Sequence, residues 1–125
     1  MLQRPTTLTN IINEDDLNDD LSTLSKNNEV IVVQVSADWC SPCKKMKGIV
    51  FNSQTNQGLA TEYVGRVKFF YIDYDQSKEF AEFYKINSVP TFMIGRLNQK
   101  GKFNFTILKG ANKEGLVEKI KTLLK

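Results

Sequence analysis

The spacing of apolar residues changes several times along the chain, between the pattern of strands and the pattern of helices. Two segments are nearly continuous runs of β-branched and aromatic residues, which is typical of strands covered on both faces. Two shorter runs flank a turn at residues 98–101, which predicts a hairpin. A segment near the amino terminus is apolar at alternate positions and is a candidate edge strand. In chain order, the predicted strands are 6–11, 30–35, 67–74, 91–95 and 103–108.

Apolar residues at helical spacing fill the intervals between these strands. Residues 59–63 follow a polar break at 52–58 and resume the preceding helix, so the count is about four helices. The strands alternate with helices before the hairpin, which predicts the α/β class with a mixed central sheet of about five strands and helices on both faces. The predicted helical segments are 14–26, 41–51 with 59–63, 80–84, and a final helix with an apolar stripe at Leu116, Val117, Ile120, Leu123 and Leu124.

The chain length fits one folding unit. With 125 residues, no internal repeat and no linker-like segment, we expect a single domain over residues 1–125. The hydrophobic fraction of 41% is ordinary for a globular protein and allows a core without cross-links. We assign Phe69, Phe70, Phe80 and Phe92 to this core, with no need for a cofactor.

The charge is weak and mixed, which limits the classes of partner. Seventeen basic and 14 acidic residues give a net charge of +3, which is too little to indicate nucleic acid as the main partner. We interpret the acidic run at 14–20 and the lysines after residue 108 as solvated helix faces. The amino terminus has no apolar signal core, and no stretch reaches transmembrane length. We therefore expect a soluble, cytoplasmic protein with no nucleic-acid or membrane partner.

Two cysteines and no histidine define the available chemistry. Without histidine, Cys–His nucleophilic catalysis and histidine metal ligation are excluded, and two thiolates cannot complete a tetrahedral zinc site within one chain. We therefore expect no metal. Cys40 and Cys43 enclose too short a loop for a disulfide to restrain the unfolded chain much, so a purely structural role is disfavoured.

The segment Cys40-Ser41-Pro42-Cys43 follows a predicted buried strand and opens a predicted helix. Unpaired backbone N–H groups and the helix dipole stabilise an anion at that position, so Cys40, at the exposed start of the helix, is expected to be the nucleophilic thiolate, with Cys43 shielded. Cys43 lies one turn along and can attack a mixed disulfide formed at Cys40. Pro42 fits the first helical turn, and Trp39 offers a flat apolar face beside the sulfur.

A second candidate feature is the segment Ser88-Val89-Pro90-Thr91-Phe92. A proline directly before an apolar strand is compatible with an ordinary trans turn. The base rate of cis bonds before proline, taken alone, disfavours a cis bond here.

Together these two features resemble the thioredoxin family. Trp39 to Lys44 match its active-site motif, and Val89-Pro90-Thr91 match its cis-proline loop. Gly110 to Lys113 match a further turn that lines the family's groove, and Asp73 falls where the family ends its central strand with an acidic residue. The resemblance extends from about Leu8 to Leu124.

The resemblance implies a thioredoxin fold, a cis Pro90, and reversible dithiol–disulfide exchange at Cys40 and Cys43 that reduces protein disulfides. It implies disulfide-containing client proteins and a thioredoxin reductase as electron donor. We expect no cofactor besides the cysteine pair, and a monomer. The resemblance places a substrate-binding surface on Trp39, Pro42, Val89, Pro90, Thr91, Gly110 and Ala111.

Several positions depart from the family pattern. Gln34 stands where the family has a buried aspartate that is thought to accept the Cys43 proton, and an amide cannot do this. We expect a water or a backbone group to satisfy the Gln34 amide, and we expect Gln34, Ser41 and Lys44 to tune the thiols. The other departures are Ser41 for a glycine, Ser36 for an aromatic residue, Gly48 for a helix-kinking proline, and a longer segment from Phe51 to Arg66.

Three alternatives stay open at this point. The cysteine pair could be idle within a thioredoxin fold, or two chains could supply four thiolates to a metal or iron–sulfur cluster. The protein could also serve a single client as a redox partner, or act as a non-catalytic adaptor in a larger assembly. The reduction potential depends on how strongly the fold stabilises the thiolate, which residue types alone do not fix.

Overall fold

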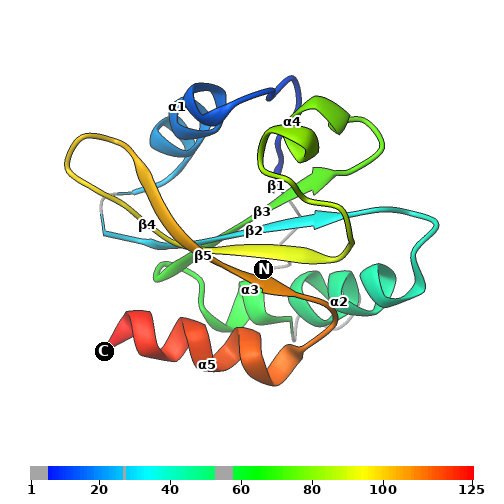
Figure 1. Ribbon diagram of the computed structural model, residues 1–125. Coiled ribbons are helices and arrows are strands. Elements are labelled where there is room, and N and C mark those ends of the chain that lie inside the picture. Colours follow the sequence, from blue (N-terminus) through cyan, green and yellow to red (C-terminus); the bar gives the residue numbers. More distant parts are fainter. Residues whose placement is uncertain (1–5, 27, 53–57) are drawn as a thin grey trace.

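The computed structural model describes residues 6–26, 28–52 and 58–125, which form a mixed five-stranded sheet in the order β1-β3-β2-β4-β5 (Figure 1). β1 and β2 both pair with β3 in parallel, whereas β4 runs antiparallel to β2 and to β5. The predicted α/β class and the mixed sheet are therefore confirmed. The strands are β1 (Thr6–Thr7), β2 (Val30–Ser36), β3 (Val67–Asp73), β4 (Thr91–Leu97) and β5 (Phe103–Lys109).

Helices cover both faces of the sheet, with one group above it and another below it in the view of Figure 1. Those above are α1 (Glu14–Leu24) and α4 (Lys78–Phe83). Those below are α2 (Ser41–Phe51), α3 (Leu59–Glu62) and α5 (Lys113–Leu124). This two-sided cover explains why all seven residues of β2 are buried, and why its sequence is almost uninterrupted in apolar residues.

Alternate residues of the central strands enter two separate cores. Val32 points to the side of α2, α3 and α5, whereas Val33 points to the side of α1 and α4. The four phenylalanines assigned to the core are buried, so that prediction is confirmed. Phe69 and Phe92 lie on the first side, and Phe70 and Phe80 on the second.

Some boundaries differ from the sequence-based expectation. The first strand extends only over Thr6–Thr7, because Asn10 adopts a left-handed backbone conformation (φ 59°) that turns the chain away from the sheet. The Leu8 N–H still donates to the Tyr71 carbonyl at 2.9 Å. Leu59–Glu62 forms a helix of its own, with Gly58 as its N-cap, so the described residues contain five helices instead of about four. Residues 53–57 of the predicted break lie outside the described part of the chain.

The described residues contain neither a membrane-spanning helix nor a cluster of metal-ligating side chains. No helix among them is long and apolar enough to cross a membrane. Residues 6–26, 28–52 and 58–125 also contain no group of three or more cysteine or acidic side chains placed to hold a metal ion.

Candidate active site

Strand register brings the two sequence motifs together at one end of the sheet. Val35 of β2 pairs with Thr91 of β4, so the chain leaving β2 toward Cys40 passes beside Pro90, which directly precedes β4. Thr91 in turn pairs with Lys109 of β5. The turn that starts at Gly110 is thereby placed next to the proline, and the Gly110 N–H donates to the Pro90 carbonyl at 2.9 Å.

Cys40 occupies the N-cap of α2 and forms a disulfide with Cys43, with 5.2 Å between their Cα atoms. The Cys43 N–H points at the Cys40 sulfur, 3.2 Å away. In the reduced protein this donor stabilises a thiolate on Cys40, together with the helix dipole. Pro42 lies in the first turn, where its missing N–H leaves no intrahelical bond unmade.

Both cysteines are largely buried, which corrects the expectation that Cys40 lies at an exposed helix start. The exposed fraction is 7% for Cys40 and 2% for Cys43. Ala37, Tyr74 and Val89 pack around the pair and cover most of the Cys40 surface. Cys40 is nevertheless the more exposed of the two cysteines, which agrees with its predicted role as the nucleophile and with that of Cys43 as the second, resolving thiol.

The Val89–Pro90 peptide bond is cis, as the family resemblance implied and the base rate did not. The Val89 carbonyl oxygen lies 3.6 Å from the Cys40 sulfur. The Thr91 hydroxyl donates to the Ser88 carbonyl at 2.8 Å and closes the loop from inside. The loop therefore presents backbone groups, with Val89 at the edge, directly beside the reactive sulfur.

The predicted substrate-binding residues surround this point but differ in exposure. Pro90 and Thr91 are buried, so their side chains contribute little to the surface of the site. Val89 and Gly110 are half-buried. The exposed members of the set are Trp39, Pro42 and Ala111.

Trp39 is 66% exposed, yet its indole is held in place. Its Nε1–H donates to Asp75 Oδ2 at 2.8 Å, and the Asp75 N–H donates to Asp73 Oδ1 at 2.9 Å. Register explains the contact, since Ser36 pairs with Asp73 and both strands end at this level. No local pattern links residues 39 and 75, so Asp75 could not be identified from the sequence.

Gln34 is 1% exposed, as predicted, but its partner differs from the expectation. Its Nε2 donates to the Ser36 hydroxyl at 3.1 Å, so a side chain serves the amide and not a backbone group. The Gln34 Oε1 has no hydrogen-bond partner among the described residues. No carboxylate replaces the missing aspartate at this position of the strand.

Tyr71 extends this buried polar group, and the sequence analysis did not identify it. It pairs with Gln34 in the β2–β3 register, and its hydroxyl is hydrogen-bonded to Ser36. Burial raises the pKa of Tyr71, the Ser36 hydrogen bond opposes that shift, and the charges of Asp38 and Asp73 add to it. Lys47 Nζ lies 4.8 Å from the ring centre. Tyr71 is therefore kept neutral beside Gln34 and Ser36.

The remaining predicted tuning residues are at the surface. Ser41 and Lys44 are both exposed on the first turn of α2. The Lys44 N–H donates to the Cys40 carbonyl at 3.1 Å, which is an ordinary helical bond.

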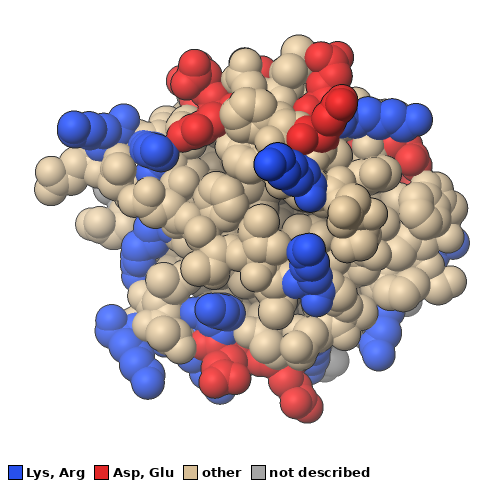
Figure 2. Space-filling model, viewed as in Figure 1, with Lys and Arg blue, Asp and Glu red and all other residues tan. Residues whose placement is uncertain are grey.

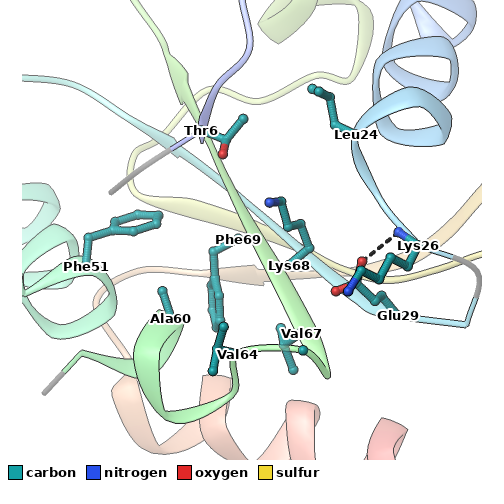
Figure 3. A pocket seen from close by; sticks show the side chains of 11 residues that line it. Thr6, Leu24, Lys26, Glu29, Phe51, Ala60, Val64, Val67, Lys68 and Phe69 are labelled. Carbon is teal, nitrogen blue, oxygen red and sulfur yellow. Dashed lines mark hydrogen bonds between the residues drawn. The ribbon is translucent and has the colours of Figure 1, made fainter. Parts of the chain in front are cut away.

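A separate hollow of about 180 Å³ lies at the opposite end of the sheet (Figure 3). Val67 and Lys26 border it where β3 begins and where the chain approaches β2, whereas Cys40 follows the carboxyl end of β2. Phe51 and Phe69, which meet edge to face, form part of its apolar wall. It contains none of the predicted site residues.

A disulfide between cysteines three residues apart, at the start of a helix and against a cis-proline loop of this sheet, defines the class of dithiol–disulfide oxidoreductase domains. The family model for thioredoxin matches residues 10–122, and the chain belongs to the thioredoxin family.

Two curated relatives and one solved structure illustrate the similarity. Thioredoxin-1 of Drosophila melanogaster is 36% identical over 72 residues, which cover 58% of this chain and 62% of that protein. The chloroplastic M-type thioredoxin of Brassica napus is 35% identical over 103 residues, covering 82% of this chain and 53% of that protein. The chain thus spans less than two thirds of the length of either relative. The X-ray structure of Fasciola hepatica thioredoxin superposes with a TM-score of 0.68 at 28% identity, covering 94% of this chain and 97% of that one.

Proposed function

We propose that this protein reduces disulfides in client proteins by reversible exchange at Cys40 and Cys43. The observation that carries the proposal is the placement of the Cys40 sulfur, at a helix N-cap and 3.6 Å from the Val89 carbonyl. The N-cap position favours the attacking thiolate on Cys40, and the Val89 carbonyl beside it marks where a client backbone lies. The reaction requires no cofactor besides the two cysteines.

The reaction proceeds in two sulfur-transfer steps. The Cys40 thiolate attacks one sulfur of the client disulfide, forms a mixed disulfide and releases the other client sulfur as a thiolate. Cys43 then loses its proton, and its thiolate attacks the Cys40 sulfur. The bond from Cys40 to the client breaks, and the released client thiolates take up protons. The client has gained two electrons, and the protein is left with the Cys40–Cys43 disulfide.

The Cys40–Cys43 disulfide must be reduced again by an external dithiol donor. We infer a thioredoxin reductase in this role, and disulfide-containing proteins as clients. A single chain supplies all the site residues described above, so the working unit is the monomer. A reducing compartment such as the cytoplasm keeps such a pair available for turnover.

The client binds as an extended segment across the loop at Val89 and Pro90. Main-chain hydrogen bonds to this loop give affinity for any sequence, and Trp39 and Ala111 contact the flanking side chains. Because the loop contributes mostly backbone groups, this arrangement favours a broad client range over a single sequence.

Turnover with two substrates tests this function. The purified protein is supplied with NADPH and a thioredoxin reductase, and reduction of a disulfide-bonded protein is followed together with reduction of a small disulfide. We expect both activities, and we expect Cys40→Ser to abolish both. Reduction of the small disulfide without any reduction of proteins would indicate a client-specific partner. Loss of neither activity in Cys40→Ser would contradict the proposal.

A further inference from the structure

The outer edge of β5 carries backbone groups that point away from the sheet. At the hairpin turn, the Asn98 N–H donates to the Lys102 carbonyl at 2.8 Å, and at the far end the Gly110 N–H donates to Pro90. Hydrogen-bonded pairs alternate along an antiparallel ladder, so the even-numbered residues of β5 exchange their bonds with β4. The odd-numbered residues, from Phe103 to Lys109, direct their N–H and C=O groups outward.

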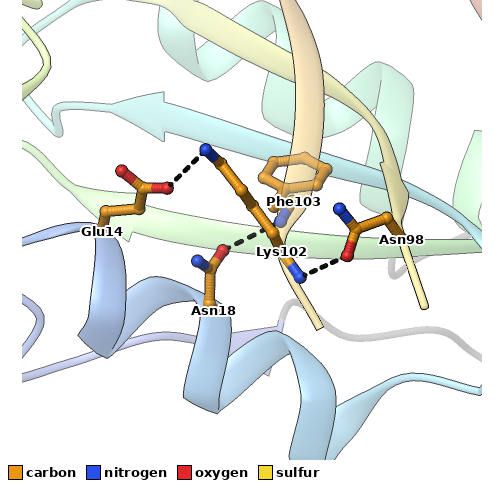
Figure 4. Close-up of polar contacts among 5 residues, drawn as sticks. All are labelled: Glu14, Asn18, Asn98, Lys102 and Phe103. Atoms are coloured by element: carbon orange, nitrogen blue, oxygen red, sulfur yellow. Dashed lines mark hydrogen bonds and ion pairs between the residues drawn. The ribbon is translucent and has the colours of Figure 1, made fainter. Parts of the chain in front are cut away.

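Helix α1 covers one end of this edge (Figure 4). The Phe103 N–H donates to Asn18 Oδ1 at 3.0 Å, and Lys102 Nζ lies 3.5 Å from the Glu14 carboxylate. The hydrogen bond from Phe103 to Asn18 confirms that the backbone groups of the odd-numbered β5 residues point outward. Beyond Phe103, the outward groups of Phe105, Ile107 and Lys109 have no hydrogen-bond partner within residues 6–26, 28–52 and 58–125.

The side chains on this edge are unusually apolar for an open strand. Ile107 is 42% exposed, and Phe105 is half-buried against Tyr84, with 5.7 Å between the ring centres. Phe83, also exposed, packs on Tyr84 at 5.0 Å. In Figure 2 the region that β5 crosses is mostly tan, with separate Lys or Arg side chains on it, and acidic side chains gather above it over α1 and α4. Open edges are normally protected by charges, proline or bulges, and of Phe105, Ile107 and Lys109 only Lys109 is charged.

We propose that a second copy of this chain pairs with β5, antiparallel and about a two-fold axis through Ile107. In this register Ile107 meets Ile107 of the second copy, and Phe105 of each chain lies opposite Lys109 of the other. The outward N–H and C=O groups of Phe105, Ile107 and Lys109 are then paired on each edge, which gives about six backbone hydrogen bonds. The sheet continues through the axis into a sheet of twice the width.

Charge complementarity favours a second copy over an unrelated strand. Tyr84, which contacts Phe105, lies in the field of Glu14 and Asp15 at the start of α1. Because Lys102 of the same chain already pairs with Glu14, Asp15 is the carboxylate that the Lys109 ammonium of the second copy would approach, with the aliphatic stem of Lys109 over the Phe105 ring. The two Lys109 side chains are themselves four residues apart along the ladder, about 14 Å, which exceeds the screening length of about 8 Å in physiological salt.

The proposed contact between the two β5 strands buries little surface, and this limits the affinity of the two copies for each other. One strand pair with its flanking side chains buries less than the roughly 1,600 Å² of a standard stable interface. The association is therefore weak, and the protein is a monomer when dilute and a dimer when concentrated. Since Cys40 lies outside the pairing strands, the exchange reaction proposed above does not depend on the dimer.

Sedimentation velocity tests the proposal, with a reducing agent present so that no intermolecular disulfide contributes. From about 1 μM to about 1 mM, we expect the average mass of the wild-type chain to rise from 14.3 kDa toward twice that value. Ile107→Lys places two ammonium groups on the axis and should stay at monomer mass. Leu24→Lys, at a leucine of similar exposure (45%) that borders the separate hollow of Figure 3, should associate like the wild type.

A charge-swap experiment tests the register. Ile107→Asp alone should also remain monomeric, whereas an equal mixture of Ile107→Lys and Ile107→Asp should form a mixed dimer, because opposite charges then meet at the axis. A wild-type chain that stays monomeric throughout the range overturns the proposal. So does a dimer that Ile107→Lys leaves intact, and so does a mixture that fails to associate.

Discussion

The amide of Gln34 donates to the hydroxyl of Ser36 two residues further along the same buried strand, across 3.1 Å. This pair, with Tyr71 bonded to the same hydroxyl, forms a polar group that contains no carboxylate. A family member with an acid at this position has an internal acceptor for the proton of the resolving cysteine. Here Cys43 must lose its proton to solvent or to the client, so we expect the second exchange step to limit turnover near neutral pH.

Introducing the acid should therefore accelerate turnover. A thiol of ordinary pKa is only a few per cent ionised at pH 7, so we expect Gln34→Asp to raise the rate about fivefold to tenfold there, with no gain above about pH 9. Burying the carboxyl should cost about 1–3 kcal/mol of stability. Gln34→Asn is the matched control, because asparagine has the size of aspartate but no acidic group, and its turnover rate should not rise. An unchanged rate and pH profile in Gln34→Asp would show that proton loss from Cys43 is not limiting.

The indole of Trp39 should depend on Asp75 for its position. Asp75→Ala removes the acceptor at 2.8 Å, and we expect the KM for a protein client to rise about twofold to fivefold, corresponding to roughly 0.5–1 kcal/mol. Asp75→Asn keeps an oxygen acceptor and should restore most of the loss. Tryptophan fluorescence anisotropy provides a second readout, since Trp39 is the single tryptophan. Equal kinetics in the alanine and asparagine variants would refute this role.

Gly48 lies inside α2 with open space where a Cβ would stand. Gly48→Ala should therefore stabilise the protein by about 0.5–1 kcal/mol, because alanine loses less backbone entropy in a helix. Urea unfolding measures this difference. Gly58→Ala is the contrasting variant, since its Cβ would lie 2.5 Å from the Val50 carbonyl oxygen, and it should destabilise the fold. A destabilised Gly48→Ala would mean that the helix differs from the one described.

Alkaline stability should depend on Tyr84. Burial, with smaller contributions from Glu14 and Asp15, raises the pKa of Tyr84 from 10.0 to about 12. The folded protein therefore holds this proton more tightly than the unfolded chain, so its contribution to stability is complete below pH 10 and is lost as the pH rises toward about 12. Melting temperatures measured over this interval should fall less steeply in Tyr84→Phe than in the wild type. Parallel curves for the two proteins would contradict the assignment.

Features that depend on neighbouring residues were predictable from the sequence. Features that depend on how distant strands align in the sheet were not. The pairing of Cys40 with Cys43 and the helix that starts beside them follow from neighbouring residues. The hairpin at residues 98–101 and the core phenylalanines follow from turn chemistry and apolar spacing. The Trp39–Asp75 contact joins residues 36 positions apart and arises only once β2 and β3 are aligned.

Other differences have equally local physical causes. The left-handed conformation of Asn10 ends the first strand early, although the apolar alternation continues to Ile11. Packing by Ala37, Tyr74 and Val89 buries Cys40, and this could not be read from its place at the start of a helix. The cis bond before Pro90 was implied by family resemblance, since residue type alone favours trans.

Trapping of mixed disulfides tests the central assignment, that Cys40 attacks and Cys43 resolves. Each single serine variant is reduced, mixed with a disulfide-bonded protein and resolved on a non-reducing gel. Cys43→Ser should accumulate a covalent complex that a reducing agent dissolves, because the attacking thiolate is present and the resolving one is absent. Cys40→Ser should accumulate none, since its remaining thiol is 2% exposed. Equal trapping by the two variants would contradict the account.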